Sequence, residues 1–353
     1  MIIFRFIYIV SMVYTGYSCY AQQNIGTIQI GATLNYHELN SVKETLFLKD
    51  FKYLTPANSA KQTIVHPKPS VWNWNRIEDF IDFSNKHNLI MRLHGPISPQ
   101  ASKWAKEDNR TANELRLLMT EFATKFAQKF NSEPTIKWMD VVNETVLPSG
   151  KWFGPKEGTD KWENPWLKIG LDENGYPYYI LKAFEMATKY ATNIKLIYNQ
   201  NGGMQTKMWD KIKETILYIR SQGHRVDGIG WQGHILLGKS TEAFTTNPDK
   251  ALDKLSQLID WAHQNKLEFH VTELDYFIAD VTKVEEGRQE QALLYEKLIK
   301  LLEKKSKTGI VTLNLWDLAE RTKKNKDGIF QSIYDSKFQP TPAYFIIKKY
   351  QNY

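Results

Sequence analysis

The sequence has little of two features that would narrow its class at once, cysteine and long apolar runs. Cys19 is the only cysteine among 353 residues, so the body of the chain can hold neither a disulfide framework nor a thiolate catalyst. No segment reaches the ~20 apolar residues that a membrane-spanning helix needs. A Gly-rich phosphate loop and histidines at ligand spacing are lacking too, so we expect no nucleotide, flavin or metal cofactor.

The first residues are typical of an export signal. Arg5 is the only charge before an apolar run from Phe6 to Tyr14, and small residues surround a possible cut after Ala21. We therefore expect residues 1–21 to be a signal peptide, and the protein to be secreted, periplasmic or on the outer surface. Cys19 could instead accept the lipid anchor of a bacterial lipoprotein, and a buried first strand or helix is the structural alternative.

Composition indicates a globular protein but does not choose between one barrel and two smaller domains; because no repeat or linker interrupts residues 22–353, we expect them to form one domain. Hydrophobic residues make up 42% and charged residues 24% of the chain, and the formal net charge is +7. Such a charge can favour nucleic acid or an anionic polymer, but the lysines are scattered along amphipathic stretches. A solvated surface is the simpler interpretation, so we expect no nucleic-acid partner. No repeat or linker divides the chain, and a monomer is expected.

A short apolar run followed by a longer amphipathic segment recurs along the chain, which is the pattern of βα units around a parallel sheet. The predicted strands are Thr27–Leu34, Phe51–Leu54, Leu89–Leu93, Ile136–Val142, Lys195–Tyr198, Gly228–Trp231, Glu268–Thr272 and Ile310–Leu315. The predicted helices include Arg76–His87, Ala112–Phe130, Tyr179–Tyr190, Met208–Ser221, Lys250–Gln264 and Gly287–Lys304. The fold class is therefore α/β, a single (β/α)8 TIM barrel with its active site at the C-terminal ends of the strands.

Polar and aromatic residues gather at those predicted strand ends. They are His94, Asn143, Glu144, Gln232, His234, Glu273 and Trp316. Glu144 and Glu273 lie in apolar strand context, where a carboxylate is costly unless it is used or paired. Glycoside hydrolysis needs two carboxyl groups, one to protonate the leaving oxygen and one to attack the anomeric carbon. Taken alone, each glutamate is more typical of a paired structural acid; together, with Trp and His residues at the same rim, the two indicate a catalytic pair.

Four motifs carry a resemblance to a known family. Trp138–Glu144 resembles a W-D-V-V-N-E acid/base motif with Met139 inserted, and Thr272–Asp275 (T-E-L-D) matches a nucleophile motif. Asp227–His234 (D-G-I-G-W-Q-G-H) matches a strand-six motif, and Pro340–Tyr344 (P-T-P-A-Y) matches a closing P-x-P-A-Y segment. In their order and spacing these motifs resemble glycoside hydrolase family 10, the retaining endo-β-1,4-xylanase family, over nearly the whole chain after the expected signal peptide.

The resemblance implies a double displacement on β-1,4-xylan or a related plant or algal polysaccharide, without a cofactor. Glu144 would be the general acid/base and Glu273 the nucleophile. Four residues are carried over as catalytic support: Asn143, Gln232, His234 and Asp275. In the family pattern the asparagine bonds the sugar 2-hydroxyl, the glutamine orients the acid, and the histidine, held by the aspartate, donates to the nucleophile. Five more residues are carried over as sugar ligands: Asn58, Lys61, His94, Gln100 and Trp316.

The sequence departs from the family pattern on the glycone side of the cleavage point. Ala57 stands where the family has glutamate, Gln62 where it has tryptophan, and Ser98-Pro99 replaces a Trp-His pair. Lys324 stands where a second aromatic platform is expected.

These departures leave two alternatives open. One is a hydrolase of a decorated, anionic or hexose-based β-glycan, in which Arg321, Lys323 and Lys324 meet a sulfate or carboxylate. The simpler interpretation of this basic loop is that it is only solvated. The other is a catalytically silent carbohydrate-binding barrel, because 11 Trp and 18 Tyr would suit sugar stacking in either case.

Overall fold

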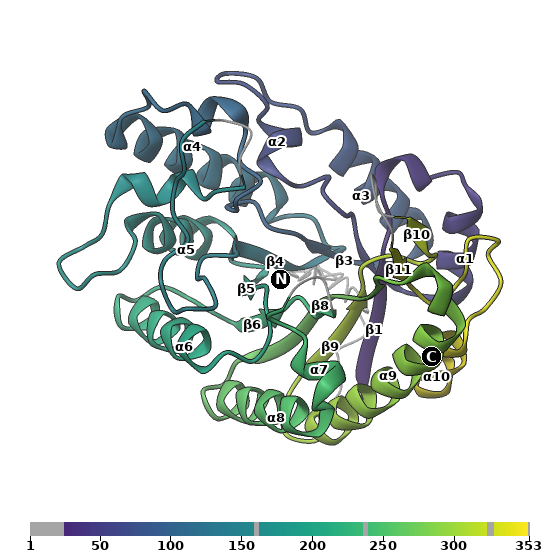
Figure 1. Ribbon diagram of the computed structural model, residues 1–353. Coiled ribbons are helices and arrows are strands. Elements are labelled where there is room, and N and C mark those ends of the chain that lie inside the picture. Colours follow the sequence, from purple (N-terminus) through teal and green to yellow (C-terminus); the bar gives the residue numbers. More distant parts are fainter. Residues whose placement is uncertain (1–24, 159–161, 236–238, 323–327, 352–353) are drawn as a thin grey trace, which may run out of the picture.

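The computed structural model describes residues 25–158, 162–235, 239–322 and 328–351. Eight parallel strands close into a barrel with helices around it, which confirms the predicted TIM barrel (Figure 1). The barrel strands are β1 (Ile28–Thr33), β2 (Tyr53–Thr55), β3 (Ile90–Leu93), β4 (Ile136–Asn143), β5 (Lys195–Gln200), β6 (Gly228–Trp231), β8 (Glu268–Ile278) and β9 (Val311–Leu315). Closure comes from β9, which pairs with both β1 and β8.

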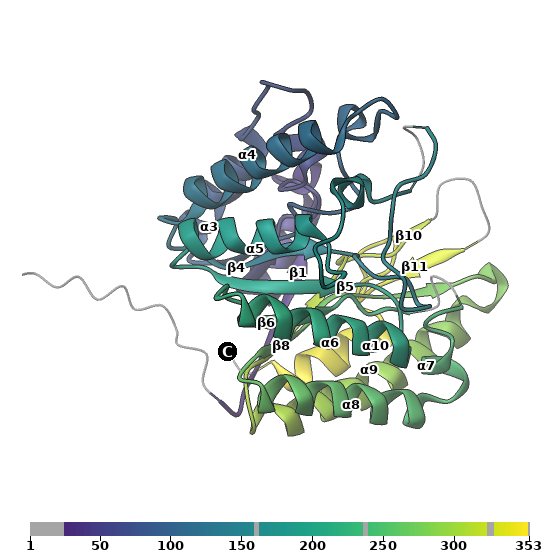
Figure 2. The same ribbon diagram turned by 90° about the vertical axis from the view of Figure 1, so that its left-hand side faces the viewer.

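The six predicted helices are present, and they cover the outside of the barrel (Figure 2). They are α3 (Asn75–His87), α4 (Ala112–Phe130), α5 (Tyr178–Tyr190), α6 (Thr206–Ser221), α8 (Pro248–Gln264) and α9 (Val284–Ser306). Local signals fix their ends: Thr111 and Glu114 form a reciprocal capping box at the start of α4, and Asn88 ends α3 in the left-handed conformation. The structure adds α1 (Val42–Asp50), α2 (Gln62–Val65), α7 (Ala243–Thr246) and α10 (Pro342–Tyr350).

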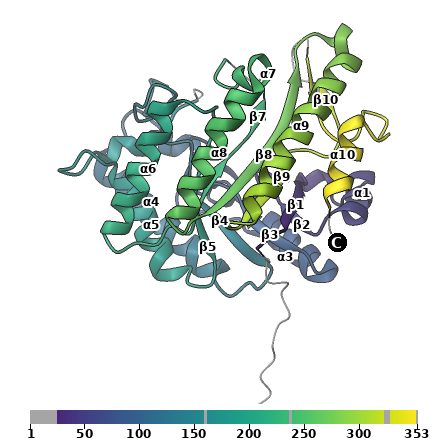
Figure 3. The same ribbon diagram turned by 90° about the horizontal axis from the view of Figure 1, so that it is seen from below.

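Strand β8 is longer than predicted and forms an extension beyond the barrel. Its last residues pair antiparallel with β11 (Ile329–Gln331), which pairs in turn with β10 (Arg321–Thr322). The short β7 (His234–Ile235) pairs with the same stretch of β8. In Figure 3, β8 runs from the body of the barrel up to the side where β7 and β10 lie. The strand that carries Glu273 therefore also anchors the segments around the barrel mouth.

The interior of the barrel is largely polar, in contrast to the apolar layer between strands and helices. Arg92 and Asp140 are fully buried and form an ion pair inside it. On β6 the inward position Gly230 leaves room for Asn199, because a Cβ there would lie 2.3 Å from Asn199 Oδ1. The small residue on one strand thus permits a hydrogen-bonding side chain on the next.

Within the described ranges no helix has the length and apolarity needed to cross a membrane. The expected signal peptide with Cys19, and the loop residues Lys323 and Lys324, lie outside the described residues.

Candidate active site

Glu273 lies at the barrel mouth on β8, and its side chain is almost completely buried (3% exposed). His234 Nε2 lies 3.2 Å from its Oε2, and His94 Nε2 lies 3.4 Å from its Oε1. Asn199 Nδ2 donates a third contact to Oε1 at 3.1 Å. A carboxylate with this many donors is oriented and stabilised in its ionised form.

Charge in the site favours the ionised Glu273. Burial alone would raise its pKa, but His94, His234 and Lys61 outweigh that effect, so the pKa is held below its ordinary value. Burial likewise disfavours charge on His234, yet the carboxylates of Asp275 and Glu273 raise its pKa to about 10. His234 is therefore an imidazolium at neutral pH, with Asp275 Oδ1 2.9 Å from its Nδ1.

Glu144 follows β4 in an unusual backbone conformation, with φ of +57°. The register of β4 against β5 shifts between Asp140 and Val142. In a regular strand, residues three apart face opposite sides, so this bulge allows both Asp140 and Asn143 to point into the barrel. Left-handed backbone at a residue with a long side chain is costly and is found preferentially at functional sites.

The turn after Glu144 is clamped by the side chain of Gln200 at the end of β5. Its Oε1 accepts hydrogen bonds from the backbone N–H groups of Thr145 and Val146 at 3.0 and 3.3 Å. Its Nε2 donates to the Val146 carbonyl at 2.9 Å. These bonds offset the strain at Glu144 and fix the direction of its carboxyl group.

Side-chain amides connect the two glutamates. Gln232 Nε2 donates to Glu144 Oε1 at 3.0 Å and to Asn143 Oδ1 at 3.1 Å. Asn143 Nδ2 also donates to Glu144 Oε1, at 3.2 Å. Asn199 Nδ2 donates to Asn143 Oδ1 at 2.9 Å, besides its bond to Glu273. A continuous amide network therefore sets Glu144 and Glu273 relative to each other.

Two cavities lie near this pair of carboxyl groups. One, of about 270 Å³, is lined by Glu144, Gln232, His234 and the half-exposed indole of Trp162. The other, of about 390 Å³, is lined by Asn58 and Trp316 among other residues. Trp316 packs edge-on against both His94 and His234, with ring centroids 5.2 and 6.0 Å apart. Trp316 therefore connects the second cavity to the two histidines that contact Glu273.

Of the two remaining predicted residues, Lys61 interacts with the carboxyl groups of the site, and no contact among the described residues places Gln100 beside them. Lys61 is buried, its pKa is lowered by burial, and Glu273, Glu144 and Asp140 are its nearest opposing charges. A Cβ on Gly95 would lie 2.6 Å from Lys61 Nζ, and the φ of +57° at Gly95 also favours glycine there. For Gln100, the structure gives one bond, from its backbone N–H to Ser98 Oγ at 3.2 Å.

Several residues of the candidate active site were not predicted from the sequence. They are Asn199, Gln200, Arg92, Asp140 and Trp162. Asp140 accepts from Arg92 and lies 2.9 Å from His94 Nδ1, so it orients a histidine that contacts Glu273. A charged residue inside the apolar run Ile90–Leu93 was an available signal for this pair. Within the described ranges, no group of three or more His, Cys, Asp or Glu residues is placed to hold a metal ion.

Comparison with known proteins supplies family and fold relatives. The sequence model described as Glycosyl hydrolase family 10 matches residues 19–350. Endo-1,4-beta-xylanase A of Caldicellulosiruptor saccharolyticus is 27% identical over 307 residues, which cover 83% of this chain and 82% of that protein. Endo-1,4-beta-xylanase A of Thermoanaerobacterium saccharolyticum is 28% identical over 339 residues, covering 90% of this chain but 26% of that longer protein.

Solved structures share the fold. Xylanase 10B from Thermotoga petrophila RKU-1, solved in complex with xylobiose, superposes with a TM-score of 0.77 at 22% identity, over 92% of this chain and 94% of that one. The structure titled GH10 from Paenibacillus barcinonensis gives a TM-score of 0.78 at 20% identity, over 93% and 97% of the two chains.

Proposed function

Because the chain belongs to glycosyl hydrolase family 10, a retaining glycosidase family, we propose that it cleaves β-1,4-xylan within the polymer by double displacement. The observation that carries the proposal is the buried Glu273, kept ionised beside the imidazolium of His234 and joined through amides to Glu144. A nucleophilic carboxylate and a separately held acid are what the two steps of this reaction need.

In the first step, Glu273 attacks the anomeric carbon while Glu144 donates its proton to the glycosidic oxygen. The C–O bond to the leaving sugar breaks, and a glycosyl–Glu273 ester forms. In the second step, Glu144 takes a proton from water, the water oxygen attacks the same carbon, and Glu273 leaves as carboxylate. Two inversions give net retention of configuration.

The surrounding residues act on the charge that develops in these steps. Asn143 offers its amide to the 2-hydroxyl of the sugar at the cleavage point, a bond that strengthens as that sugar becomes oxocarbenium-like. Gln232 holds Glu144, while His234 and His94 hold Glu273. Asp275 keeps His234 charged.

The two cavities assign the two sides of the cleavage point. An acid that protonates the leaving oxygen faces the leaving sugar, so the cavity lined by Glu144 takes the aglycone. There the exposed indole of Trp162 offers a flat apolar face for stacking a sugar ring. The cavity with Asn58 and Trp316 takes the glycone. Lys61 and Gln100 are proposed as further sugar ligands on the family pattern alone. Sugars held on both sides support cleavage inside a chain.

Product analysis on purified xylan tests the proposal. We expect a mixture of short oligosaccharides, new reducing ends of β configuration, and no turnover by the Glu273→Ala variant. The variant Glu303→Ala, altered at an exposed carboxylate on α9, should match the wild type. An α-configured first product would exclude double displacement, and sugar binding without any cleavage would instead indicate a carbohydrate-binding barrel.

We also propose that the enzyme acts outside the cytoplasm, since residues 1–21 have the pattern of an export signal. Mass spectrometry of the mature N-terminus distinguishes a cut after Ala21 from lipidation at Cys19.

A further inference from the structure

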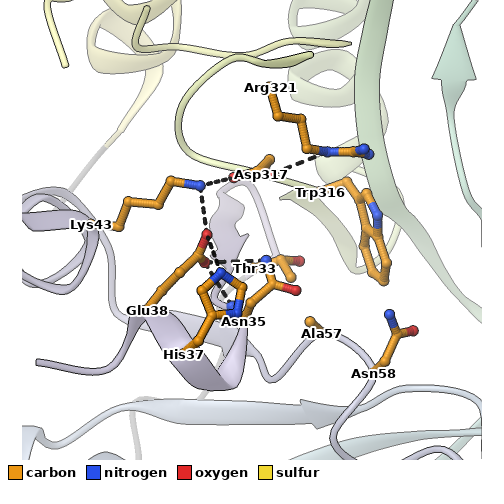
Figure 4. Close-up of a pocket in the computed structure, with 10 residues that line it drawn as sticks. All are labelled: Thr33, Asn35, His37, Glu38, Lys43, Ala57, Asn58, Trp316, Asp317 and Arg321. Carbon is orange, nitrogen blue, oxygen red and sulfur yellow. Dashed lines mark hydrogen bonds and ion pairs between the residues drawn. The ribbon is translucent and has the colours of Figure 1, made fainter. Parts of the chain in front are cut away.

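One wall of the glycone-side cavity is a row of four charged side chains of alternating sign. They are Glu38, Lys43, Asp317 and Arg321. Lys43 Nζ lies 2.6 Å from Glu38 Oε1 and 2.8 Å from Asp317 Oδ1. Arg321 Nε lies 3.2 Å from Asp317 Oδ2. The formal charges cancel along this row, which Figure 4 shows running from Glu38 to Arg321.

The two acids of this wall are already engaged. Glu38 Oε2 accepts from the backbone N–H of Asn35 at 2.7 Å, and its Oε1 accepts from Lys43. Asp317 Oδ1 accepts from the backbone N–H of Leu318 at 2.9 Å as well as from Lys43. Neither carboxylate is left uncompensated, so the wall does not repel an incoming anion as two free acids would.

Arg321 is the member of this row with donors to spare. Its Nε is bound to Asp317, and its guanidinium lies over the Phe330 ring at 4.0 Å. No hydrogen bond or ion pair within the described ranges occupies its two terminal Nη groups. The backbone is held too, because Arg321 pairs with Phe330 in the small sheet that extends β8. The free edge of a positioned guanidinium matches the two oxygens of a carboxylate or sulfate.

The opposite wall offers space and no competing charge. Ala57 presents only a methyl group to the cavity, next to Asn58. Figure 4 places the Arg321 guanidinium on the same side of the cavity as the Trp316 indole. A sugar stacked at Trp316 therefore has room for a substituent directed toward Arg321.

We propose that this cavity binds an anionic substituent, a carboxylate or a sulfate, on a glycone-side sugar, with the Nη groups of Arg321 as its donors. The proposal rests on the proposed function, because it defines which decorated β-glycan the same site prefers.

The test compares three β-1,4-xylo-oligosaccharides of equal length: unsubstituted, carrying one uronic-acid side group, and carrying one sulfate ester on a glycone-side sugar. The measured quantity is the ratio of kcat/KM for each anionic substrate to kcat/KM for the neutral one. A charge-assisted pair predicts a ratio of about ten or more for at least one substituent, and the two anionic arms identify which. Raising the ionic strength from about 0.01 M to about 1 M should reduce the ratio, because the screening length falls from about 30 to about 3 Å.

Variants separate this site from general charge attraction. Arg321→Gln should bring the ratio to about one, and Arg321→Lys should leave an intermediate ratio, because it keeps the charge but loses the two-pronged geometry. Arg116→Gln, on the exposed face of α4, should keep the wild-type ratio.

A wild-type ratio near one, or an unchanged ratio in Arg321→Gln, overturns the inference. If Arg321→Gln does not fold, the wild-type ratio and Arg321→Lys decide it. Failure to cleave any of the three substrates would instead refute the proposed xylanase activity.

Discussion

Replacing His234 by glutamine should move the acidic limb of the pH–rate profile upward. The change removes a positive charge 3.2 Å from Glu273 Oε2 but keeps a side chain that can donate a hydrogen bond. In the wild type the pKa of Glu273 is lowered, although burial acts to raise it. Without the imidazolium, burial is opposed mainly by His94 and Lys61, so the nucleophile should ionise at a higher pH.

The pKa of His234, about 10, reflects the same attraction. Burial acts to lower that pKa, and the attraction of the Asp275 and Glu273 carboxylates more than offsets it, with Asp275 the larger contributor. A hydrogen bond to a charged group contributes roughly 1.5–3 kcal/mol. Interaction between two titrating groups is reciprocal, so loss of the imidazolium should move the acidic limb upward by about one pH unit or more at about 1.36 kcal/mol per unit.

The assay is kcat/KM on an aryl β-xylobioside with a good leaving group, measured from about pH 3 to about pH 9. kcat/KM reports ionisation of the free enzyme, and a good leaving group needs little help from the protonated Glu144. The acidic limb then follows Glu273. His224→Gln, in the turn before β6, serves as the matched control. An acidic limb at the wild-type pH in His234→Gln would refute the electrostatic role assigned to His234.

Three further predictions concern the acid, the barrel interior and the pH range of stability. Glu144→Ala should lose far more activity on xylan than on activated aryl glycosides, and equal losses would remove its assignment as the acid. Gly230→Ala should lower the free energy of unfolding by about 1–3 kcal/mol, measured in urea, because its Cβ meets Asn199 Oδ1 at 2.3 Å; an unchanged unfolding midpoint would contradict this packing. The stabilising contribution of His234, whose pKa is raised, is complete below about pH 6.5 and is lost as pH rises through about 10. That of Glu273, whose pKa is lowered, is complete above about pH 4.3 and is lost as pH falls through its folded-state pKa. The melting temperature should therefore be highest and constant between about pH 4.3 and about pH 6.5. A melting temperature that increases as the pH is raised beyond about 10 would contradict this.

The barrel was predictable because a local pattern of apolar residues marks each of its strands and most of its helices. The eight strands are short apolar runs, and the six predicted helices carry a clear three- and four-residue apolar spacing. The end of β8 was placed too early because the acids Glu273 and Asp275 interrupt the apolar run, whereas β7 and β11 supply backbone partners there that no local pattern reveals. Helix α1 was missed because three of its four apolar residues, Leu46, Phe47 and Leu48, are consecutive and do not repeat at helical spacing; of these only Phe47 is buried.

The candidate site was predictable where a charged residue stands in an apolar strand. Glu144 and Glu273 stand out as acids in apolar strands, whereas Asn199 ends a strand with an ordinary polar residue. Its place between Asn143 and Glu273 depends on the bulge in β4 and on the missing side chain of Gly230. The bulge and the space beside Gly230 are both relations between neighbouring strands, and neither can be read from the sequence of one strand.

The buried charges of the barrel interior link the fold to the chemistry. Asp140 is fully buried, and its carboxylate serves both Arg92 and His94. Since a buried ion pair stabilises little net but is costly to break, this arrangement contributes position more than stability. His94 is fixed from below by Asp140 and contacts Glu273 from the side. The position of His94, and through it the lowered pKa of Glu273, therefore depends on Arg92 and Asp140, so substitutions of these two residues should alter the pH dependence of catalysis.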